Sequence, residues 1–270
     1  SYGNDGDAVG NAVQVDDGKF GEGFYFDGVG DYVDVGDIGN IKTISYWIKA
    51  DSVDEYVLDL DGGTHYIWHN SYPEGFTNAT VYVDGVQEDI LGDEKTTNGD
   101  FDADTSWSKG DGWSIADGVA SCDGSQAAES SVLQNQGLTI GSQYLVTFDV
   151  LNYAAGNVRI LLRGTTTSSK SADGSYTEYV LITNNWANTY VMASSAFVGS
   201  VDNVSVKQVN DLVSSNQWHH VVITTDTAID ADSVELGKQS SNYFNGSIDE
   251  VLIFNRSLDV TEILALYNAS

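Results

Sequence analysis

Aromatic residues in polar surroundings are the feature of this sequence most suited to binding chemistry. Trp107, Tyr153 and Trp186 each lie among small or polar residues, in stretches typical of loops or strand ends. Flat aromatic rings stack against the C–H faces of sugars, and nearby polar groups bond the sugar hydroxyls. These three residues are therefore candidate sugar-binding positions, whereas Trp113 precedes an apolar alternation and is expected in a core.

Two arginines add hydrogen-bonding capacity to the same part of the chain. Arg159 and Arg163 are four residues apart in an apolar stretch that predicts a strand, so both are expected on one face of it. Their guanidinium groups could bond sugar hydroxyls or carboxylates. Ion pairing with an acidic surface is the alternative, and the sequence does not favour one over the other.

A second aromatic group occupies residues 66–73. Tyr66 and Trp68 alternate on one strand face, which favours core packing. His69 and Tyr72 lie farther out toward a turn and are the better ligand candidates. The aromatic and imidazole side chains of residues 218–220 are interpreted as structural.

Catalytic motifs are sparse. The sequence contains no His-Glu-x-x-His, Gly-x-Ser-x-Gly or P-loop pattern. Glycosidases on β-sandwiches place paired carboxylates on one strand face, and the nearest such stretch, residues 57–61, contains no Glu. We therefore expect a protein that is not an enzyme, with a polysaccharide hydrolase or lyase as an alternative.

The elements that must position these residues are almost all β-strands. Alternating apolar and polar residues predict strands at 31–35, 41–50 and 143–151, with turns made by Gly, Asn and Asp. One helix is expected near the end, where Asp259 would cap it and Glu262 would complete a capping box. The sequence predicts an all-β fold with a short C-terminal helix.

Two similar closing strands suggest two β-sandwiches in one chain. Residues 199–206 and 246–254 both start with Gly-Ser, and each contains one Asp, Asp202 or Asp249, between apolar residues. The composition shifts toward Ser, Gly and Asp near Gly92, and the earlier pattern resumes after Val209. We therefore predict that one sandwich is inserted into the other.

The charge of the chain limits its partners. Forty acidic and eleven basic residues give a formal net charge of −29. Such a surface repels phosphate backbones and anionic membranes, so nucleic acid is not an expected partner. The excess of Asp beside Gly or Asn is typical of turns and of calcium loops, and calcium is the expected cofactor.

Other features bear on the setting of the protein. No apolar run is long enough to span a bilayer, so membrane insertion is not expected. The sequence begins at Ser1, and we expect it to be part of a larger multidomain protein. The single cysteine, Cys122, excludes an internal disulfide and is expected to be a small buried residue.

Five motifs carry a resemblance to a known family. They are Gly21-x-Gly23-Phe24-x-Phe26-Asp27-Gly28, Thr43-Ile44-Ser45-x-Trp47-Ile48, Val81-Tyr82-Val83-Asp84-Gly85, Trp218-His219-His220-Val221 and Phe244-Asn245-Gly246-Ser247-Ile248-Asp249-Glu250-Val251. In this order, interrupted once, they resemble a laminin-G-like jelly roll of the concanavalin A type. The resemblance implies such a domain at residues 1–95 and 209–270.

The interrupting segment resembles a second family. It begins with Asn98-Gly99-Asp100-Phe101-Asp102, continues with Gly141-x-x-Tyr144-x-Val146-x-Phe148, and ends with the strand at 199–206. These pieces are similar to carbohydrate-binding modules of families 4 and 9, which are jelly rolls of the galactose-binding type. The resemblance implies an inserted jelly roll at residues 96–208.

Both resemblances imply metal sites. In modules like the insert, a structural calcium ion joins the N-terminal turn to the closing strand, which corresponds here to Asp102 and Asp202 with Asp100 nearby. The outer domain would similarly hold calcium at Asp249, with Asp27 as the side-chain helper. The alternative is that these carboxylates only cap turns.

The residues and the resemblances together favour glycan binding. We expect a non-catalytic, lectin-like protein, stabilised by calcium, that binds a polysaccharide or cell-surface glycan. The expected location is extracellular, on a cell or a bacteriophage virion surface. An adhesion or virion structural module that binds protein is the main alternative, since both folds also host such functions.

Overall fold

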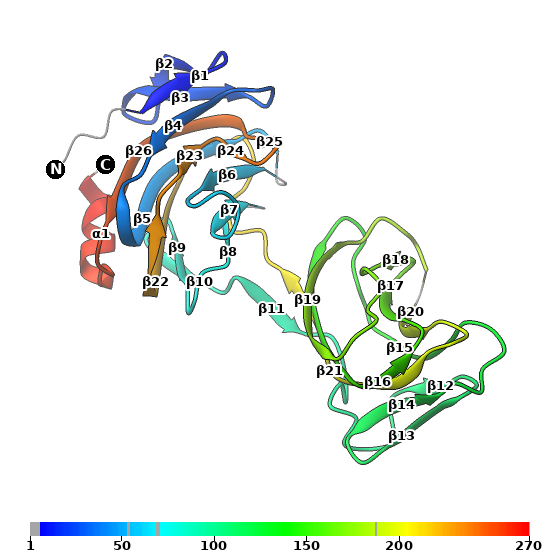
Figure 1. Ribbon diagram of the computed structural model, residues 1–270. Coiled ribbons are helices and arrows are strands. Elements are labelled where there is room, and N and C mark those ends of the chain that lie inside the picture. Colours follow the sequence, from blue (N-terminus) through cyan, green and yellow to red (C-terminus); the bar gives the residue numbers. More distant parts are fainter. Residues whose placement is uncertain (1–5, 53–54, 69–70, 187, 270) are drawn as a thin grey trace. The chain divides into compact units, whose positions relative to one another are not determined.

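The computed structural model describes residues 6–52, 55–68, 71–186 and 188–269. The chain divides into two compact units, which we call the first unit, residues 1–90 and 211–270, and the second unit, residues 91–210. Strands make up nearly all of the regular structure, and the helix α1 (Val260–Ala269) lies at the C-terminal end (Figure 1). The predicted all-β fold with a short C-terminal helix is confirmed. In the described part of the chain, no helix is long and apolar enough to cross a membrane.

The first unit contains two large antiparallel sheets and a small hairpin. The six-stranded sheet has the order β1 (Asp7–Val9), β4 (Tyr32–Gly36), β23 (Val234–Leu236), β6 (Tyr56–Asp59), β7 (Tyr66–Trp68) and β8 (Tyr72–Glu74). The seven-stranded sheet has the order β10 (Val86–Glu88), β9 (Thr80–Val83), β22 (His219–Ala231), β5 (Gly39–Ala50), β26 (Asn245–Phe254), β3 (Gly21–Asp27) and β2 (Val13–Gly18). The hairpin consists of β24 (Lys238–Gln239) and β25 (Asn242–Tyr243).

The first unit is built from two stretches of sequence, one before and one after the second unit. Val83 of β9 pairs with Val221 of β22, although the whole of residues 91–210 separates the two strands. Val81, Val83, Val221 and Ile223 are buried in one core. The chain therefore leaves a partly built sheet, completes another unit and returns.

Strand β5 shows how sequence alternation builds this unit. Ile44, Tyr46 and Ile48 are buried in the core between the sheets. Ser45 and Trp47 point to the other face, yet both are also buried. They are buried because α1 packs on that face, where the buried Ile263 joins Val222 and Leu258 in a separate apolar cluster.

Helix α1 begins with the predicted capping box. Asp259 Oδ1 accepts hydrogen bonds from the backbone N–H groups of Thr261 and Glu262, at 2.9 and 3.0 Å. Glu262 Oε2 accepts a reciprocal bond from the Asp259 N–H at 3.1 Å. Two of the free N–H groups of the first turn thus have a side-chain acceptor, as a helix start favours.

Removal of this cap has a measurable cost. We expect Asp259→Ala to lower the free energy of unfolding by about 1 kcal/mol, because two helix N–H groups lose their acceptor. Urea unfolding of the purified chain measures the change. Asp259→Asn keeps a capping oxygen and should stay close to the wild type, and equal losses in both variants would contradict the capping role.

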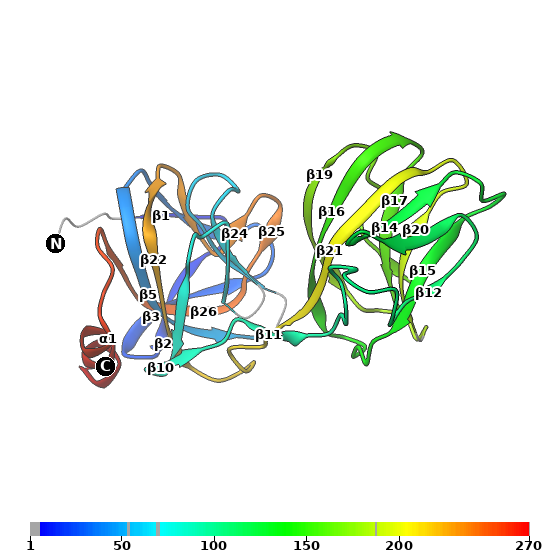
Figure 2. The same cartoon turned by 90° about the horizontal axis from the view of Figure 1, so that it is seen from below.

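The second unit is also a pair of packed antiparallel sheets. One sheet has the order β13 (Trp113–Ala116), β14 (Val119–Asp123), β21 (Val198–Val209), β16 (Gln143–Ala155) and β19 (Gly174–Leu181), and β11 (Leu91–Glu94) also pairs with β21. The other has the order β12 (Ser108–Lys109), β15 (Ser130–Asn135), β20 (Asn188–Ala193), β17 (Val158–Leu162) and β18 (Thr165–Thr166). Figure 2 shows the long strands β16 and β21 side by side.

The core of the second unit lies between these sheets. Tyr144, Val146 and Phe148 alternate inward from β16, and Trp113 and Cys122 are buried in the same cluster. The unit starts earlier than the sequence indicates, because Leu91 of β11 pairs with Val209. Residues 91–95 therefore belong to the second unit and not to the first.

Candidate functional site

A tight hairpin turn forms the base of the best candidate site. Leu162 of β17 pairs with Thr165 of β18, so Arg163 and Gly164 are the two turn residues. Both have positive φ, at 48° and 94°, which is the geometry of the turn that matches the twist of a two-residue hairpin. The Arg163 N–H donates to the Asn188 carbonyl at 3.1 Å, which ties the turn to the start of β20.

Trp186 lies on this turn and is open to solvent. The backbone N–H of Trp186 donates a hydrogen bond to the Arg163 carbonyl at 3.4 Å. A Cβ atom at Gly164 would lie 3.3 Å from the indole atoms Cγ and Cδ2, so the ring packs directly on the glycine. The residue is nevertheless 59% exposed, an uncommon state for tryptophan.

Polar groups surround this ring. Arg163 Nη2 donates a hydrogen bond to Asn185 Oδ1 at 3.1 Å, while Arg163 Nε is buried and has no partner among the described residues. We call Arg163, Gly164, Asn185 and Trp186 the hairpin platform. A flat exposed ring with a guanidinium and an amide beside it can stack on a sugar ring and bond its hydroxyls.

The structure brings together only two of the predicted sugar-binding residues, Arg163 and Trp186. Trp107 is a correction: only 6% of it is exposed, it packs on Phe101 at 5.3 Å between ring centroids, and its Nε1 donates to the Asn98 carbonyl. The polar residues around it in sequence are exposed, but the indole is core. Trp107 therefore cannot present a sugar-binding face.

Tyr153 and Arg159 also have structural roles. The Tyr153 ring packs against the core of the second unit, and its hydroxyl donates to the Gly156 carbonyl at 3.0 Å. Arg159 Nη2 bonds both carboxylate oxygens of Glu129, at 3.0 and 3.1 Å. The ion-pair alternative thus describes Arg159, and the sugar-binding hypothesis for both residues is not supported by their contacts.

Of the predicted ligand residues of the first unit, the structure describes Tyr72, which lies on β8 next to β7. Tyr72 pairs with Trp68 across these strands and is 8% exposed. His69 lies outside the described residues. Ile67 faces the core between the sheets, so Tyr66 and Trp68 lie on the opposite face of their sheet. Trp68 is buried there at 9% exposure, as its expected packing role requires, and Tyr66 is half-buried.

The predicted calcium residues of the second unit lie close enough to influence one another. Burial raises the pKa of the Asp202 carboxyl, and the charges of Asp149, Asp100 and Asp102 raise it further. A hydrogen bond from the Asn203 backbone N–H lowers this pKa but does not cancel the rise. Asp149 pairs with Asp202 across β16 and β21, and the sequence analysis did not include it. Among the described residues, however, no three His, Cys, Asp or Glu side chains are arranged to hold a metal ion.

The predicted partners of the first unit do not share a site. Asp27 lies opposite Asn245 on β26, four residues from Asp249, which is about 13 Å along a strand. Asp249 instead accepts hydrogen bonds from the Phe20 and Glu250 N–H groups, at 3.0 and 2.8 Å. The pairing of Asp27 with Asp249 in one calcium site is therefore wrong, since Asp249 anchors the turn between β2 and β3.

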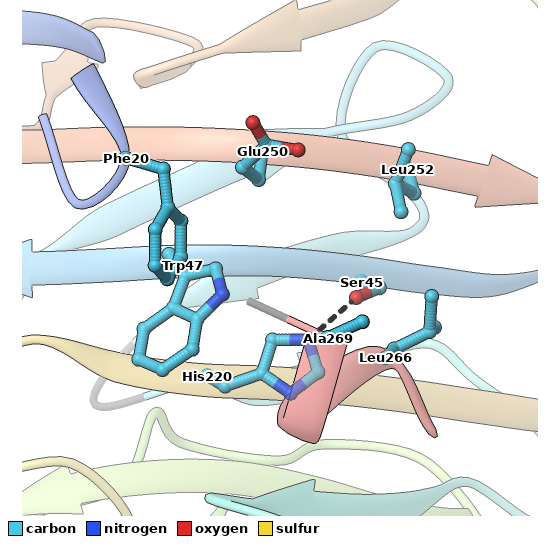
Figure 3. Close-up of a pocket in the computed structure, with 8 residues that line it drawn as sticks. All are labelled: Phe20, Ser45, Trp47, His220, Glu250, Leu252, Leu266 and Ala269. Atoms are coloured by element: carbon cyan, nitrogen blue, oxygen red, sulfur yellow. Dashed lines mark hydrogen bonds between the residues drawn. The ribbon is translucent and has the colours of Figure 1, made fainter. Parts of the chain in front are cut away.

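A cavity of ≈ 330 Å³ lies between α1 and the seven-stranded sheet (Figure 3). It is lined by Phe20, Ser45, Trp47, His220, Glu250, Leu252, Leu266 and Ala269. Ser45 Oγ lies 2.9 Å from His220 Nε2, a pair that the sequence analysis did not recognise because its members are 175 residues apart. The imidazole packs beside the rings of Trp47 and Tyr267, whose centroids lie 5.1 and 5.9 Å from its own and 6.0 Å from each other.

This serine–histidine pair does not form a catalytic triad with Asp84. Asp84 accepts the His220 backbone N–H and lies 2.9 Å from His219 Nδ1, so it bonds the main chain of His220 and not its ring. His220 Nδ1 is buried without a partner among the described residues. Burial lowers the pKa of His220 to about 4, although Asp84 acts in the opposite direction. The ring is therefore neutral near pH 7, and its contacts are those of a packed side chain.

Comparisons with known proteins give no family for this chain. No protein-family model matches it, and no curated protein matches it. Among solved structures, it is similar to the "Binding domain of Botulinum Neurotoxin DC in complex with SialylT", with a TM-score of 0.12 and 11% sequence identity. The alignment covers 81% of this chain and 52% of that chain, so about half of that structure's length is matched. At this TM-score the likeness carries no argument about fold or function.

Proposed function

We propose that this chain is a non-catalytic glycan-binding protein of an extracellular, cell or virion surface, and that the hairpin platform is its sugar contact. The observation that carries the proposal is Trp186, which packs on Gly164 and still exposes 59% of its surface. The exposed indole offers a flat apolar face of the kind on which sugar rings stack. The guanidinium of Arg163 supplies donors beside it.

The resemblance of both units to families of jelly rolls supports the same proposal. The first unit resembles laminin-G-like domains, and the second resembles carbohydrate-binding modules of families 4 and 9. Fold resemblance alone does not establish function, so the proposal depends on the platform and not on the fold. A single platform of this size binds weakly, and many copies on a surface would raise the avidity.

Pull-down on insoluble polysaccharides and a glycan array test this proposal with the full chain. We expect retention on at least one polysaccharide and release by the soluble form of that glycan. No retention on any glycan, with or without calcium, would refute sugar binding. Release of reducing sugar from a bound polysaccharide would instead indicate a hydrolase.

We also propose structural calcium in the second unit, with Asp100, Asp102 and Asp202 among its ligands. The support is electrostatic, because the charges of Asp149, Asp100 and Asp102 act on the half-buried Asp202, and a cation would relieve their repulsion. Backbone carbonyls would have to supply the remaining oxygens. The ion would stabilise the turn after β11 against β21 and take no part in chemistry.

Calcium is expected to raise the stability of the second unit. At roughly 100 times the Kd, the added calcium should contribute about 2.7 kcal/mol to the free energy of unfolding. Thermal unfolding in calcium and in chelator measures this difference. Asp202→Asn should abolish the calcium effect, whereas Asp27→Asn, in the first unit, should retain it. A chelator without effect on the wild type would contradict the proposal.

A further inference from the structure

One sheet of the second unit carries no carboxylate. Its five strands, β12, β15, β20, β17 and β18, contain neither Asp nor Glu. The whole chain has forty acidic residues, yet residues 130–148, 150–172 and 179–201, which supply four of these strands, include none. The hairpin platform is built on the turn between β17 and β18. It therefore lies in a part of a strongly acidic protein from which acidic residues are missing.

Arg163 differs from the other arginines of the chain. There are three arginines, and two of them hold a carboxylate of the protein itself. Arg159 Nη2 bonds both carboxylate oxygens of Glu129, at 3.0 and 3.1 Å. Arg256 bonds Glu262 through two nitrogen atoms, at 2.7 and 2.6 Å. Arg163 forms no ion pair with any described residue, and its side chain bonds only a neutral amide.

The donors of Arg163 are incompletely satisfied. A guanidinium group has five N–H donors, and the described contacts account for one, from Nη2 to Asn185 Oδ1. The buried Nε atom has lost water without gaining an acceptor, which costs free energy. The positive charge is delocalised over the whole guanidinium, so a carboxylate at its Nη groups would compensate it. A neutral hydroxyl would do so less well, because hydrogen bonds to an ionised partner are about twice as strong.

The backbone at Arg163 is also an unfavourable place for an arginine. Two-residue turns with positive φ at both positions prefer Asn-Gly or Asp-Gly, because most other side chains are strained there. Among the described residues that have positive φ and are not glycine, Arg163 is the only basic one. A long charged side chain kept at such a position indicates that the side chain itself is needed.

From these observations we infer that the glycan bound by the hairpin platform is acidic. The ring of a uronic acid would stack on Trp186, and its carboxylate would be bound by the guanidinium of Arg163. This inference rests on the proposed function of the platform and adds the class of sugar. It gives Arg163 the carboxylate partner that the protein does not supply.

The positions of Trp186 and Arg163 suit a uronic acid. The Trp186 backbone N–H bonds the Arg163 carbonyl, and the indole packs on Gly164, the next residue of the same turn. A uronic acid carries its carboxylate directly on a ring carbon, so the apolar face and the charge of the sugar lie close together. One short turn can therefore bind both parts of the same sugar residue.

The net charge of −29 does not prevent this binding. At physiological ionic strength, charges more than about 8 Å apart are largely screened. The side chains next to the platform in sequence are neutral, and Thr165 and Thr183 bond each other there. The acidic surface elsewhere repels an anionic polymer and would restrict its binding to the platform.

Binding measurements with the full chain test the inference on polygalacturonate, alginate and hyaluronan, each in its native and its carboxyl-reduced form. Reduction replaces the carboxylate with a hydroxymethyl group and keeps the sugar ring. We expect at least one native polymer to be retained and its reduced form to bind about tenfold more weakly or less. Calcium is left out of the buffer, because it would bridge the carboxylates of the protein to those of the polymer.

The outcomes separate this inference from the proposed function. Equal affinity for native and reduced polymers, or retention on neutral glycans such as xylan alone, would overturn the inference and leave glycan binding intact. Tighter binding of dextran sulfate than of every native uronate would make the anion a sulfate and overturn the assignment of a carboxylate. No retention on any glycan would refute the proposed function, and the inference with it.

Arg163→Asn separates the role of the side chain from that of the turn. Asparagine suits the turn geometry, so the thermal unfolding midpoint should be unchanged or higher. Affinity for the native polymer should fall about tenfold, to that of the reduced polymer, while affinity for the reduced polymer should hardly change. A lower midpoint with both affinities preserved would give Arg163 a purely structural role and refute the inference.

Arg256→Gln is the matched control. It also removes one arginine, but from the first unit, where Glu262 is the partner of the guanidinium. It should leave the affinities for the native and the reduced polymer unchanged. Equal losses in Arg163→Asn and Arg256→Gln would indicate a response to overall charge and refute the site.

Discussion

Replacement of Trp186 by alanine is expected to reduce glycan affinity about 30-fold or more. An exposed tryptophan that serves as the centre of a binding site contributes 2 kcal/mol or more, and about 1.4 kcal/mol corresponds to a factor of ten. The stability of the chain should hardly change, because 59% of the residue is already exposed. Binding isotherms on the polysaccharide that retains the wild type measure the loss.

Matched variants make this result specific. Trp107→Ala also removes an indole from the second unit, but it removes one that is only 6% exposed. It should therefore destabilise the unit by about 3–5 kcal/mol and leave the affinity of the remaining folded protein unchanged. Trp186→Phe keeps a flat ring and should retain part of the affinity. If Trp186→Ala binds like the wild type, the hairpin platform is not the sugar site.

Acidification is expected to destabilise the first unit through His220. The pKa of this imidazole is lowered from 6.5 to about 4 in the folded protein, mainly by burial. Between these values the unfolded chain binds a proton that the folded chain does not, so stability falls as the pH falls. This contribution is fully present above about pH 6.5. It decreases by about 3 kcal/mol by pH 4, at 1.36 kcal/mol per pKa unit.

Urea unfolding at a series of pH values between 4 and 7 measures this effect as a difference between variants. His220→Gln keeps a polar group near Ser45 without a titrating ring, so its stability should depend less on pH in that range. His219→Gln removes the adjacent imidazole, which bonds Asp84 and Ser214 at the start of β22, and should retain the wild-type slope from His220. Parallel curves for the wild type and His220→Gln would contradict a buried neutral His220.

The proximity of His220 to α1 predicts where this instability begins. A charged imidazole in contact with the rings of Trp47 and Tyr267 would lie in a largely apolar setting under the helix. The helix packs on the sheet through few buried residues, of which Ile263 is the main one within α1. Hydrogen exchange at low pH should therefore rise first in α1 and the adjacent part of β22.

The sequence alone determined the local elements of secondary structure. The alternation of residues 41–50 is enough to put Ile44 and Ile48 on one face and Ser45 and Trp47 on the other, as the structure has them, because a strand presents successive side chains to opposite faces. The capping box of α1 was also predictable, since it depends on two residues three positions apart. The all-β fold follows from such local patterns.

Only the tertiary structure decided which residues can meet a ligand. Trp107 and Trp186 have similar polar neighbours in sequence, yet one is core and the other is exposed, because burial depends on strands that pack from elsewhere in the chain. Asp34, Glu235 and Asp59 come to lie side by side on three strands of one sheet, in registers that no local pattern specifies. The Ser45–His220 pair joins residues on either side of the inserted unit. The physical reason is the same in each case: local alternation sets the face of a side chain, but long-range strand pairing sets its neighbours.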